Sequence, residues 1–323
     1  MDLGTRNRRS LLRDTAALSV GAALIGFPPL VNAQSGDATP SPTLGDTLDL
    51  TAPGDRNGEF LDISDGARIF YEVSGEGDPM LLLHGYPLSG ALFARNRDAL
   101  AEQYQVITVD HRGYGLSEAP AVPDDVSLYA SDALAVLDEL GVQQAIIGGH
   151  SMGGAITFEI YRTDPDRFRA MMLIDTIAAP ANLIEAALWQ GFAAEAQQNG
   201  ISMAYIDSLI KDMLSGDTRV NQPEQAAYLT QVVKQVTVDG AIGGATVLAN
   251  RSDNTELLAQ ITVPTLVFVG VEDSIYPVMI SQMMADAIPD ATLVTIPGAA
   301  HAAIFEAPDE SSQAILDWAM GLS

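Results

Sequence analysis

Residues 145–154 read Ala-Ile-Ile-Gly-Gly-His-Ser-Met-Gly-Gly, and they carry the strongest structural signal in this chain. The first four are an apolar run typical of a buried strand, and residues 155–162 continue with a helical pattern. Between them, Gly149 to Gly153 matches G-x-S-x-G, in which a sharp strand-to-helix turn raises a serine hydroxyl above the end of a sheet. The pentapeptide alone also fits a glycine-rich turn with an incidental serine, so its strand and helix context is what points to a nucleophile at Ser151.

The chain around this motif alternates short β-rich runs with longer helical patterns from about residue 59 onward. The predicted strands lie at 67–73, 80–83, 105–110, 145–148, 170–174, 265–269 and 292–296, and the helical stretches include 127–140, 276–287 and 311–320. Such alternation predicts an α/β fold with a mostly parallel, doubly wound sheet. From about 177 to 254 the alternation stops, and an Ala-, Gln-, Leu- and Met-rich helical region predicts a cap inserted over the active-site end of the sheet.

The first 33 residues have the features of a signal peptide. The pair Arg8-Arg9 precedes an apolar run from about residue 16 to 30, and Val31-Asn32-Ala33 resembles an A-x-A cleavage site. The arginine pair followed by Leu11-Leu12 also resembles the twin-arginine export signal. We therefore expect a protein exported to the periplasm or the medium, with no stable membrane span after cleavage.

A membrane anchor is the alternative for the same segment. A span needs about 20 apolar residues, whereas this run ends at Phe27-Pro28-Pro29. Residues 34–58 are rich in Ser, Thr, Pro, Gly and Asp with little periodicity, which predicts a flexible linker. The expected organisation is a signal peptide at 1–33, a linker at 34–58 and one domain at 59–323.

The composition excludes several classes of function. Acidic residues outnumber basic ones by 42 to 16, so no face can gather the positive field that nucleic acids require. The acidity itself fits either solubility or a high-salt habitat. The chain has no Cys, which excludes disulfides and thiolate chemistry, and its 4 His show no HExxH spacing. We expect neither a metal nor a cofactor.

A serine hydroxyl needs a base within hydrogen-bond reach, and that base needs a group to orient it. Asp273 follows the predicted strand at 265–269, and His301 follows the one at 292–296. Open parallel sheets place their sites at these carboxyl ends of strands. We predict a triad of Ser151, His301 and Asp273. The alternative acid is Asp175, which also ends a strand.

Residues 59–318 resemble the α/β-hydrolase superfamily. The matching motifs are Leu83-His84-Gly85-Tyr86-Pro87, Asp110-His111-Arg112-Gly113-Tyr114-Gly115-Leu116-Ser117, the serine turn, Gly270 to Pro277, and Gly298 to Pro308. Within it, the chain is most similar to the carboxylesterase, lactonase and cofactor-free haloperoxidase or perhydrolase group. Haloalkane dehalogenases and epoxide hydrolases carry Asp at the nucleophile position, so Ser151 argues against both.

An oxyanion hole needs two backbone N–H groups aimed at the developing negative charge. The turn geometry assigns one to Met152, the residue after the nucleophile. The resemblance assigns the other to Tyr86, which otherwise forms only a wall of the pocket.

The expected reaction is ester hydrolysis through an acyl-enzyme on Ser151, with a small-molecule ester or lactone as substrate. A lactonase, a perhydrolase or haloperoxidase and a C–C bond hydrolase would use the same triad. The rival from another class is a non-catalytic small-molecule binder, because fold alone does not establish function. The sequence does not predict the oligomeric state.

Overall fold

The computed structural model describes residues 53–54 and 56–322. The predicted signal peptide at 1–33 and most of the predicted linker lie outside the described residues. The export prediction therefore stays a prediction. Within the described part of the chain, no helix combines the length and the apolar character needed to cross a membrane.

A sheet of eight strands forms the centre of the described chain. Its strands are β1 (Glu59–Asp62), β2 (Arg68–Ser74), β3 (Asp78–Leu83), β4 (Tyr104–Val109), β5 (Ala145–His150), β6 (Phe168–Ile174), β7 (Thr265–Gly270) and β8 (Ala291–Ile296). Their spatial order is β1-β2-β4-β3-β5-β6-β7-β8. The β1–β2 and β2–β4 pairs are antiparallel, and all other pairs are parallel. The predicted mostly parallel sheet is confirmed.

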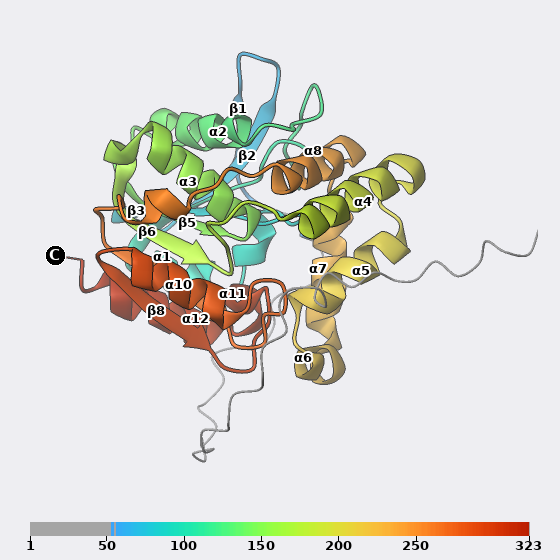
Figure 1. Ribbon diagram of the computed structural model, residues 1–323. Coiled ribbons are helices and arrows are strands. Elements are labelled where there is room, and N and C mark those ends of the chain that lie inside the picture. Colours follow the sequence, from blue (N-terminus) through green and yellow to red (C-terminus); the bar gives the residue numbers. More distant parts are fainter. Residues whose placement is uncertain (1–52, 55, 323) are drawn as a thin grey trace, which may run out of the picture.

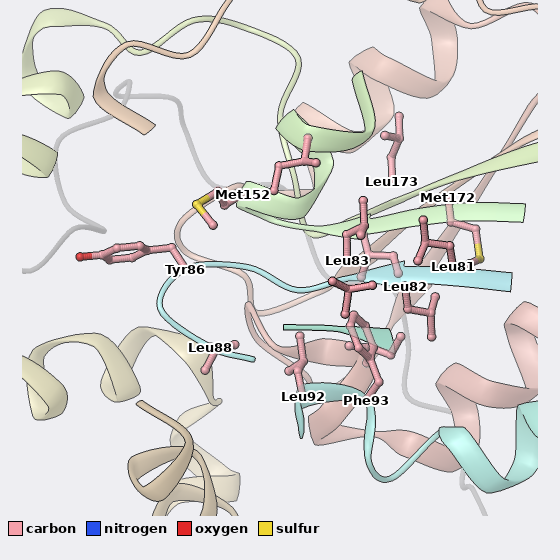
Figure 2. Close-up of a cluster of buried hydrophobic side chains, with 14 of the residues drawn as sticks. Leu81, Leu82, Leu83, Tyr86, Leu88, Leu92, Phe93, Met152, Met172 and Leu173 are labelled. Carbon is pink, nitrogen blue, oxygen red and sulfur yellow. The ribbon is translucent and has the colours of Figure 1, made fainter. Parts of the chain in front are cut away.

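The central strands are buried on both faces, which explains their continuous apolar sequences. Every residue of β5 and β7 is buried, as are the last four residues of β3. Figure 2 shows part of this core, where Leu81, Leu82 and Leu83 of β3 lie close to Met172 of β6. Parallel strands covered on both faces need such residues, because helices pack against each side.

Helices connect and cover the strands. They are α1 (Arg97–Ala101), α2 (Val126–Glu139), α3 (Met152–Thr163), α9 (Thr255–Leu258), α10 (Val278–Ala287), α11 (Ala303–Glu306) and α12 (Pro308–Ala319), with short 3₁₀ turns η2 (Gly90–Phe93) and η3 (Pro165–Arg167). The chain moves one way across the sheet through α1 and the other way through α2, α3 and α10. Because such crossovers are right-handed, α1 lies on the opposite face from α2, α3 and α10. Helix α12 contacts α1.

Between β6 and the short helix α9, which precedes β7, the described chain forms five further helices. They are α4 (Leu183–Asn199), α5 (Met203–Met213), α6 (Gly216–Asn221), α7 (Pro223–Val233) and α8 (Val238–Ala249). Figure 1 shows them gathered at one end of the molecule, beside the sheet and its covering helices. Helices α4 and α8 pack against each other. We refer to α4–α8 as the cap.

The start of the domain differs from the sequence expectation at two points. Strand β1 was not predicted, because its residues Glu-Phe-Leu-Asp are mostly exposed and lack a clear alternation. Arg56, which falls inside the predicted linker, is packed into the domain. Its guanidinium bonds Glu72 of β2 and Asp110, the residue after β4. The ordered domain thus includes Arg56.

Candidate active site

Ser151 stands at the turn between β5 and α3. Its backbone has φ 53°, in the left-handed region that non-glycine residues rarely adopt. Such a conformation costs on the order of 1–3 kcal/mol and persists only where the surroundings fix it. Here the Ser151 N–H donates to Ile174 O at 2.9 Å, and its carbonyl accepts from Gly154 N and the Thr176 hydroxyl. The sheet and the helix together hold the strained turn.

The glycines of the motif are required by space. A Cβ on Gly149 would overlap the Gly153 backbone, and a Cβ on Gly153 would overlap the carbonyl of Leu83 at the end of β3. Gly85 has the same constraint, because its Cβ would lie 2.5 Å from His150 Nδ1 and 2.8 Å from Ser151 Cβ. The serine turn and the loop after β3 therefore touch backbone to backbone.

The structure brings the three predicted triad residues together. Ser151 Oγ lies 2.9 Å from His301 Nε2, and His301 Nδ1 lies 2.9 Å from Asp273 Oδ2. The other Asp273 oxygen accepts the N–H groups of Ile275 at 2.8 Å and Tyr276 at 3.0 Å. The Asp273 carboxylate accepts a hydrogen bond from the Nδ1–H of His301. The Nε2 of a neutral His301 is therefore unprotonated and can accept the serine proton. This geometry suits general-base activation of a hydroxyl.

Asp175, the alternative acid, lies elsewhere. Its Oδ1 accepts from Gly270 N at 2.8 Å and its Oδ2 from Ala303 N at 3.3 Å. Its hydrogen bonds therefore go to the backbone, and the His301 ring is bonded by Asp273 instead. Burial and the nearby negative charge of Asp273 raise the pKa of Asp175 well above its usual range. The arrangement makes Asp175 a structural carboxyl group.

The two predicted oxyanion donors lie beside each other above the strand ends. Figure 2 shows Tyr86 and Met152 as neighbours, with the Tyr86 ring directed away from the strand core. Met152 begins α3, so its N–H has no intrahelical acceptor. Within the described part of the chain, neither this N–H nor that of Tyr86 donates a hydrogen bond. Both are available to an incoming oxygen.

Three buried histidines fix the loops around the site. His111 N donates to His84 Nε2 at 2.9 Å, so His84 carries its proton on Nδ1, which donates to Gly85 O at 2.9 Å. His150 Nε2 donates to His301 O at 2.7 Å. Desolvation lowers the pKa of His84 and His150 to about 3. The His111 ring Nε2 donates to His84 O at 3.1 Å, and desolvation also lowers the pKa of His111. All three imidazoles therefore stay neutral and bond backbone atoms around the site.

The cap closes over the site. Ser151 is 7% exposed and His301 1%. Trp189 of α4 meets the Tyr86 ring edge-on, with centroids 5.5 Å apart. A Cβ on Gly244 of α8 would lie 2.7 Å from Tyr86 Cδ2 and 3.2 Å from Met152 Sδ. The cap therefore contacts both Tyr86 and Met152.

Sequence reasoning missed two side chains that support the site. Glu306 bonds the N–H of Ala300, next to His301, and the N–H of Ser215 in the cap. Tyr205 of α5 forms a hydrogen bond with the Tyr86 hydroxyl. For Glu306 the only available signal was its place in the Gly298 to Pro308 motif. Nothing in the sequence near Tyr205 marks it.

Comparisons with known proteins agree with this architecture. The chain is 31% identical over 261 residues to a non-heme haloperoxidase of Rhodococcus erythropolis, covering 75% of this chain and 92% of the relative. It is 28% identical over 265 residues to a bifunctional esterase/perhydrolase of Acinetobacter calcoaceticus, covering 75% and 92%. A solved thermophilic esterase from Thermogutta terrifontis superposes with a TM-score of 0.79 at 29% identity, covering 83% of this chain and 99% of that one.

The family assignment rests on the greater part of the chain. Residues 78–308 match the model of the family described as alpha/beta hydrolase fold. That stretch contains the serine turn, both other triad positions and the whole cap. The chain therefore belongs to the α/β-hydrolase family.

Proposed function

We propose that this protein is a serine hydrolase that cleaves carboxylic esters through an acyl-enzyme on Ser151. The observation that carries the proposal is the continuous hydrogen-bonded line Ser151–His301–Asp273, with 2.9 Å at each step. A non-catalytic binder has no need of such a line. The family and its esterase-named members support hydrolysis, and the ester bond is the part that we propose.

In the first half-reaction, Ser151 Oγ attacks the ester carbonyl carbon while His301 Nε2 takes the serine proton. The carbonyl oxygen becomes an oxyanion that accepts from the N–H groups of Tyr86 and Met152. When the tetrahedral intermediate collapses, His301 returns that proton to the leaving alkoxide. The products are the free alcohol and an acyl group bonded to Ser151.

In the second half-reaction, water attacks the acyl carbon and His301 takes one of its protons. Collapse of the second intermediate breaks the acyl–Ser151 bond, and His301 gives the proton back to Oγ. Asp273 keeps the imidazole in the required tautomer throughout and stabilises the imidazolium. The carboxylic acid leaves, and the enzyme returns to its starting state.

The test is turnover of short- and medium-chain p-nitrophenyl esters by the wild type, Ser151→Ala and Ser274→Ala. Ser274 neighbours the triad acid and is exposed, so its variant controls for a serine-to-alanine change. We expect wild-type turnover in Ser274→Ala and a loss of about three or more orders of magnitude in Ser151→Ala, because only the oxyanion hole and binding remain.

Labelling gives a readout that is independent of the chosen ester. A phosphonate that traps activated serines should add one equivalent to the wild type and none to Ser151→Ala, as read by mass spectrometry. An unlabelled wild type, or an Ser151→Ala variant with undiminished turnover, would exclude this mechanism.

Perhydrolysis is a second candidate, favoured by the names of the haloperoxidase and esterase/perhydrolase relatives. It would use the same acyl-enzyme, with hydrogen peroxide in place of water and a peracid as product. Comparing acid and peracid formation from one ester, with and without peroxide, separates the two. Lactone opening on the same enzyme is the parallel test for a lactonase.

Export by the twin-arginine route remains a proposal that rests on the first 33 residues alone. We expect the mature chain to begin near Gln34 and the double change Arg8→Lys with Arg9→Lys to block translocation. N-terminal sequencing of the protein from separated cell fractions checks both. Full-length protein found only in the cytoplasm would refute the export signal.

A further inference from the structure

The Tyr86 side chain joins the oxyanion loop to the cap. It is 2% exposed, and its hydroxyl lies 3.0 Å from Ala241 O in α8 and in hydrogen-bond contact with the Tyr205 hydroxyl in α5. A carbonyl oxygen can only accept a hydrogen bond, so the Tyr86 hydroxyl donates its one proton to Ala241 O. The bond between the two tyrosines must then be donated by Tyr205. The result is a directed chain from Tyr205 to Tyr86 to Ala241.

The same residue is held on its remaining sides. The Trp189 ring of α4 meets it edge-on, and Gly244 of α8 leaves no room for a Cβ beside its ring. On the backbone side, Gly85 packs against His150 and Ser151. The Tyr86 side chain therefore packs between three cap helices, α4, α5 and α8, while its backbone N–H belongs to the proposed oxyanion hole.

We propose that Tyr205 is a positioning residue, which acts through Tyr86 to hold the Gly85–Tyr86 peptide in its oxyanion-binding orientation. This inference rests on the proposed ester hydrolysis. Full stabilisation of the oxyanion then requires the cap in its closed position, since opening separates Tyr205 and Ala241 from Tyr86.

Tyr114 offers a matched control. Its hydroxyl donates to Gly240 O at 2.8 Å, the carbonyl next to Ala241 on the same helix, and its side chain is fully buried. Tyr114→Phe removes the same atom and a similar bond between domain and cap. Tyr114 lies in the loop after β4 and contributes no N–H to the oxyanion hole. A general loosening of the cap would affect Tyr114→Phe and Tyr205→Phe alike.

The experiment compares Tyr205→Phe, Tyr86→Phe, the double variant and Tyr114→Phe in the full chain. The readouts are kcat, KM and the affinity of a boronic acid that forms a tetrahedral adduct on Ser151. Because one hydrogen bond contributes modestly, we expect kcat and boronic-acid affinity to fall about three- to tenfold in Tyr205→Phe, with KM within about twofold. Tyr114→Phe should keep kcat within about twofold of the wild type.

The double variant distinguishes action through Tyr86 from an independent effect. If Tyr205 acts only by way of Tyr86, the double variant loses no more kcat than Tyr86→Phe alone, whereas independent residues give multiplied losses. Multiplied losses, a change confined to KM, or equal effects of Tyr205→Phe and Tyr114→Phe would overturn the inference. Wild-type turnover in Ser151→Ala would overturn the proposed function itself. The tyrosine variants test only the positioning role, so the two failures can be told apart.

Discussion

Two neighbouring strands of the sheet are each followed by an aspartate, and the two side chains bond different partners. Asp175 comes directly after β6, and Asp273 comes three residues after β7, its parallel neighbour. The short connection turns Asp175 back into the scaffold, where it binds the N–H groups of Gly270 and Ala303. The longer one carries Asp273 out to His301. A few residues of loop decide which carboxylate can orient a base.

The two carboxyl groups also differ in their surroundings, and the pKa of Asp175 responds to Asp273. Asp273 is bonded to His301 and to two backbone N–H groups. Asp175 is fully buried, and desolvation together with the charge of Asp273 raises its pKa well above the usual value. Here Asp273 bonds the His301 ring, and Asp175 bonds backbone N–H groups.

The largest expected effect comes from the acid that contacts His301. Asp273→Asn should cut kcat by up to about ten-thousandfold, because the amide favours the wrong imidazole tautomer facing Ser151. Ester turnover measured on protein with a wild-type circular dichroism spectrum checks it. Asp175→Asn is the matched control, and it should keep most of the turnover. A larger kcat loss in Asp175→Asn would reverse the assignment of the acid.

A third strand-end aspartate extends the comparison. Asp110 follows β4 and is paired with Arg56, which bonds both of its oxygens at 2.8 and 2.9 Å. Arg56→Met leaves Asp110 and Glu72 buried without this cation, and breaking a buried pair from one side costs about 3–5 kcal/mol. Urea unfolding should show that loss.

Arg97→Met provides the control for Arg56→Met. Among the residues that the structure describes, Arg97 pairs with Glu72 alone, and its side chain is 23% exposed against 7% for Arg56. Arg97→Met should therefore lose less unfolding free energy than Arg56→Met, because a more exposed ion pair is better solvated. Equal losses in the two variants would mean that Arg56 adds nothing through Asp110.

Asp175→Asn should be less costly than Arg56→Met. The amide keeps the size of the carboxyl group and one acceptor oxygen, but its NH₂ faces a backbone N–H that loses its partner. An unsatisfied buried donor costs about 1–3 kcal/mol, so we expect a loss of that order in unfolding free energy. Thermal and urea unfolding at one pH measure it. Unchanged stability would show that these backbone bonds contribute little.

The sequence revealed those parts of the site that follow strand ends. Ser151 and His301 each stand next to a clear apolar run, so their meeting at one sheet edge could be predicted. Asp175 and Asp273 satisfied the same rule, and choosing between them needed the family's usual acid loop, since the direction of a side chain is set by tertiary contacts. The structure places Asp273 against His301.

Contacts between distant and unremarkable segments could not be predicted. Arg56 lies in a stretch rich in Pro, Gly and Asp that looks like a linker, and its partner Asp110 is 54 positions away. Tyr205 bonds a residue 119 positions away, from a helix whose sequence shows only an amphipathic pattern. Composition and periodicity report burial, and they do not report which buried groups meet.

The last predicted effect is the gradual pH dependence that Asp175 gives to the free energy of unfolding. Its pKa is raised in the folded state, so the folded protein holds this proton at pH values where the unfolded chain has released it. Stability from this group is complete below the unfolded pKa of about 3.9, and it falls as pH rises toward the folded pKa, by at most about 1.4 kcal/mol per unit.

Asn does not titrate, so the stability deficit of Asp175→Asn should shrink as pH rises. Urea unfolding of the wild type and Asp175→Asn between pH 5 and pH 9, roughly the range above that unfolded pKa, gives the difference between their unfolding free energies at each pH. The other acids titrate in both proteins, so their contributions subtract out of this difference. In an Asp273→Asn background burial still raises the pKa of Asp175, but the nearby negative charge is absent. The pH range over which stability falls should therefore end at a lower pH. Parallel stability curves for the wild type and Asp175→Asn would show that Asp175 is ionised in the folded protein and that the two strand-end carboxylates differ in their partners alone.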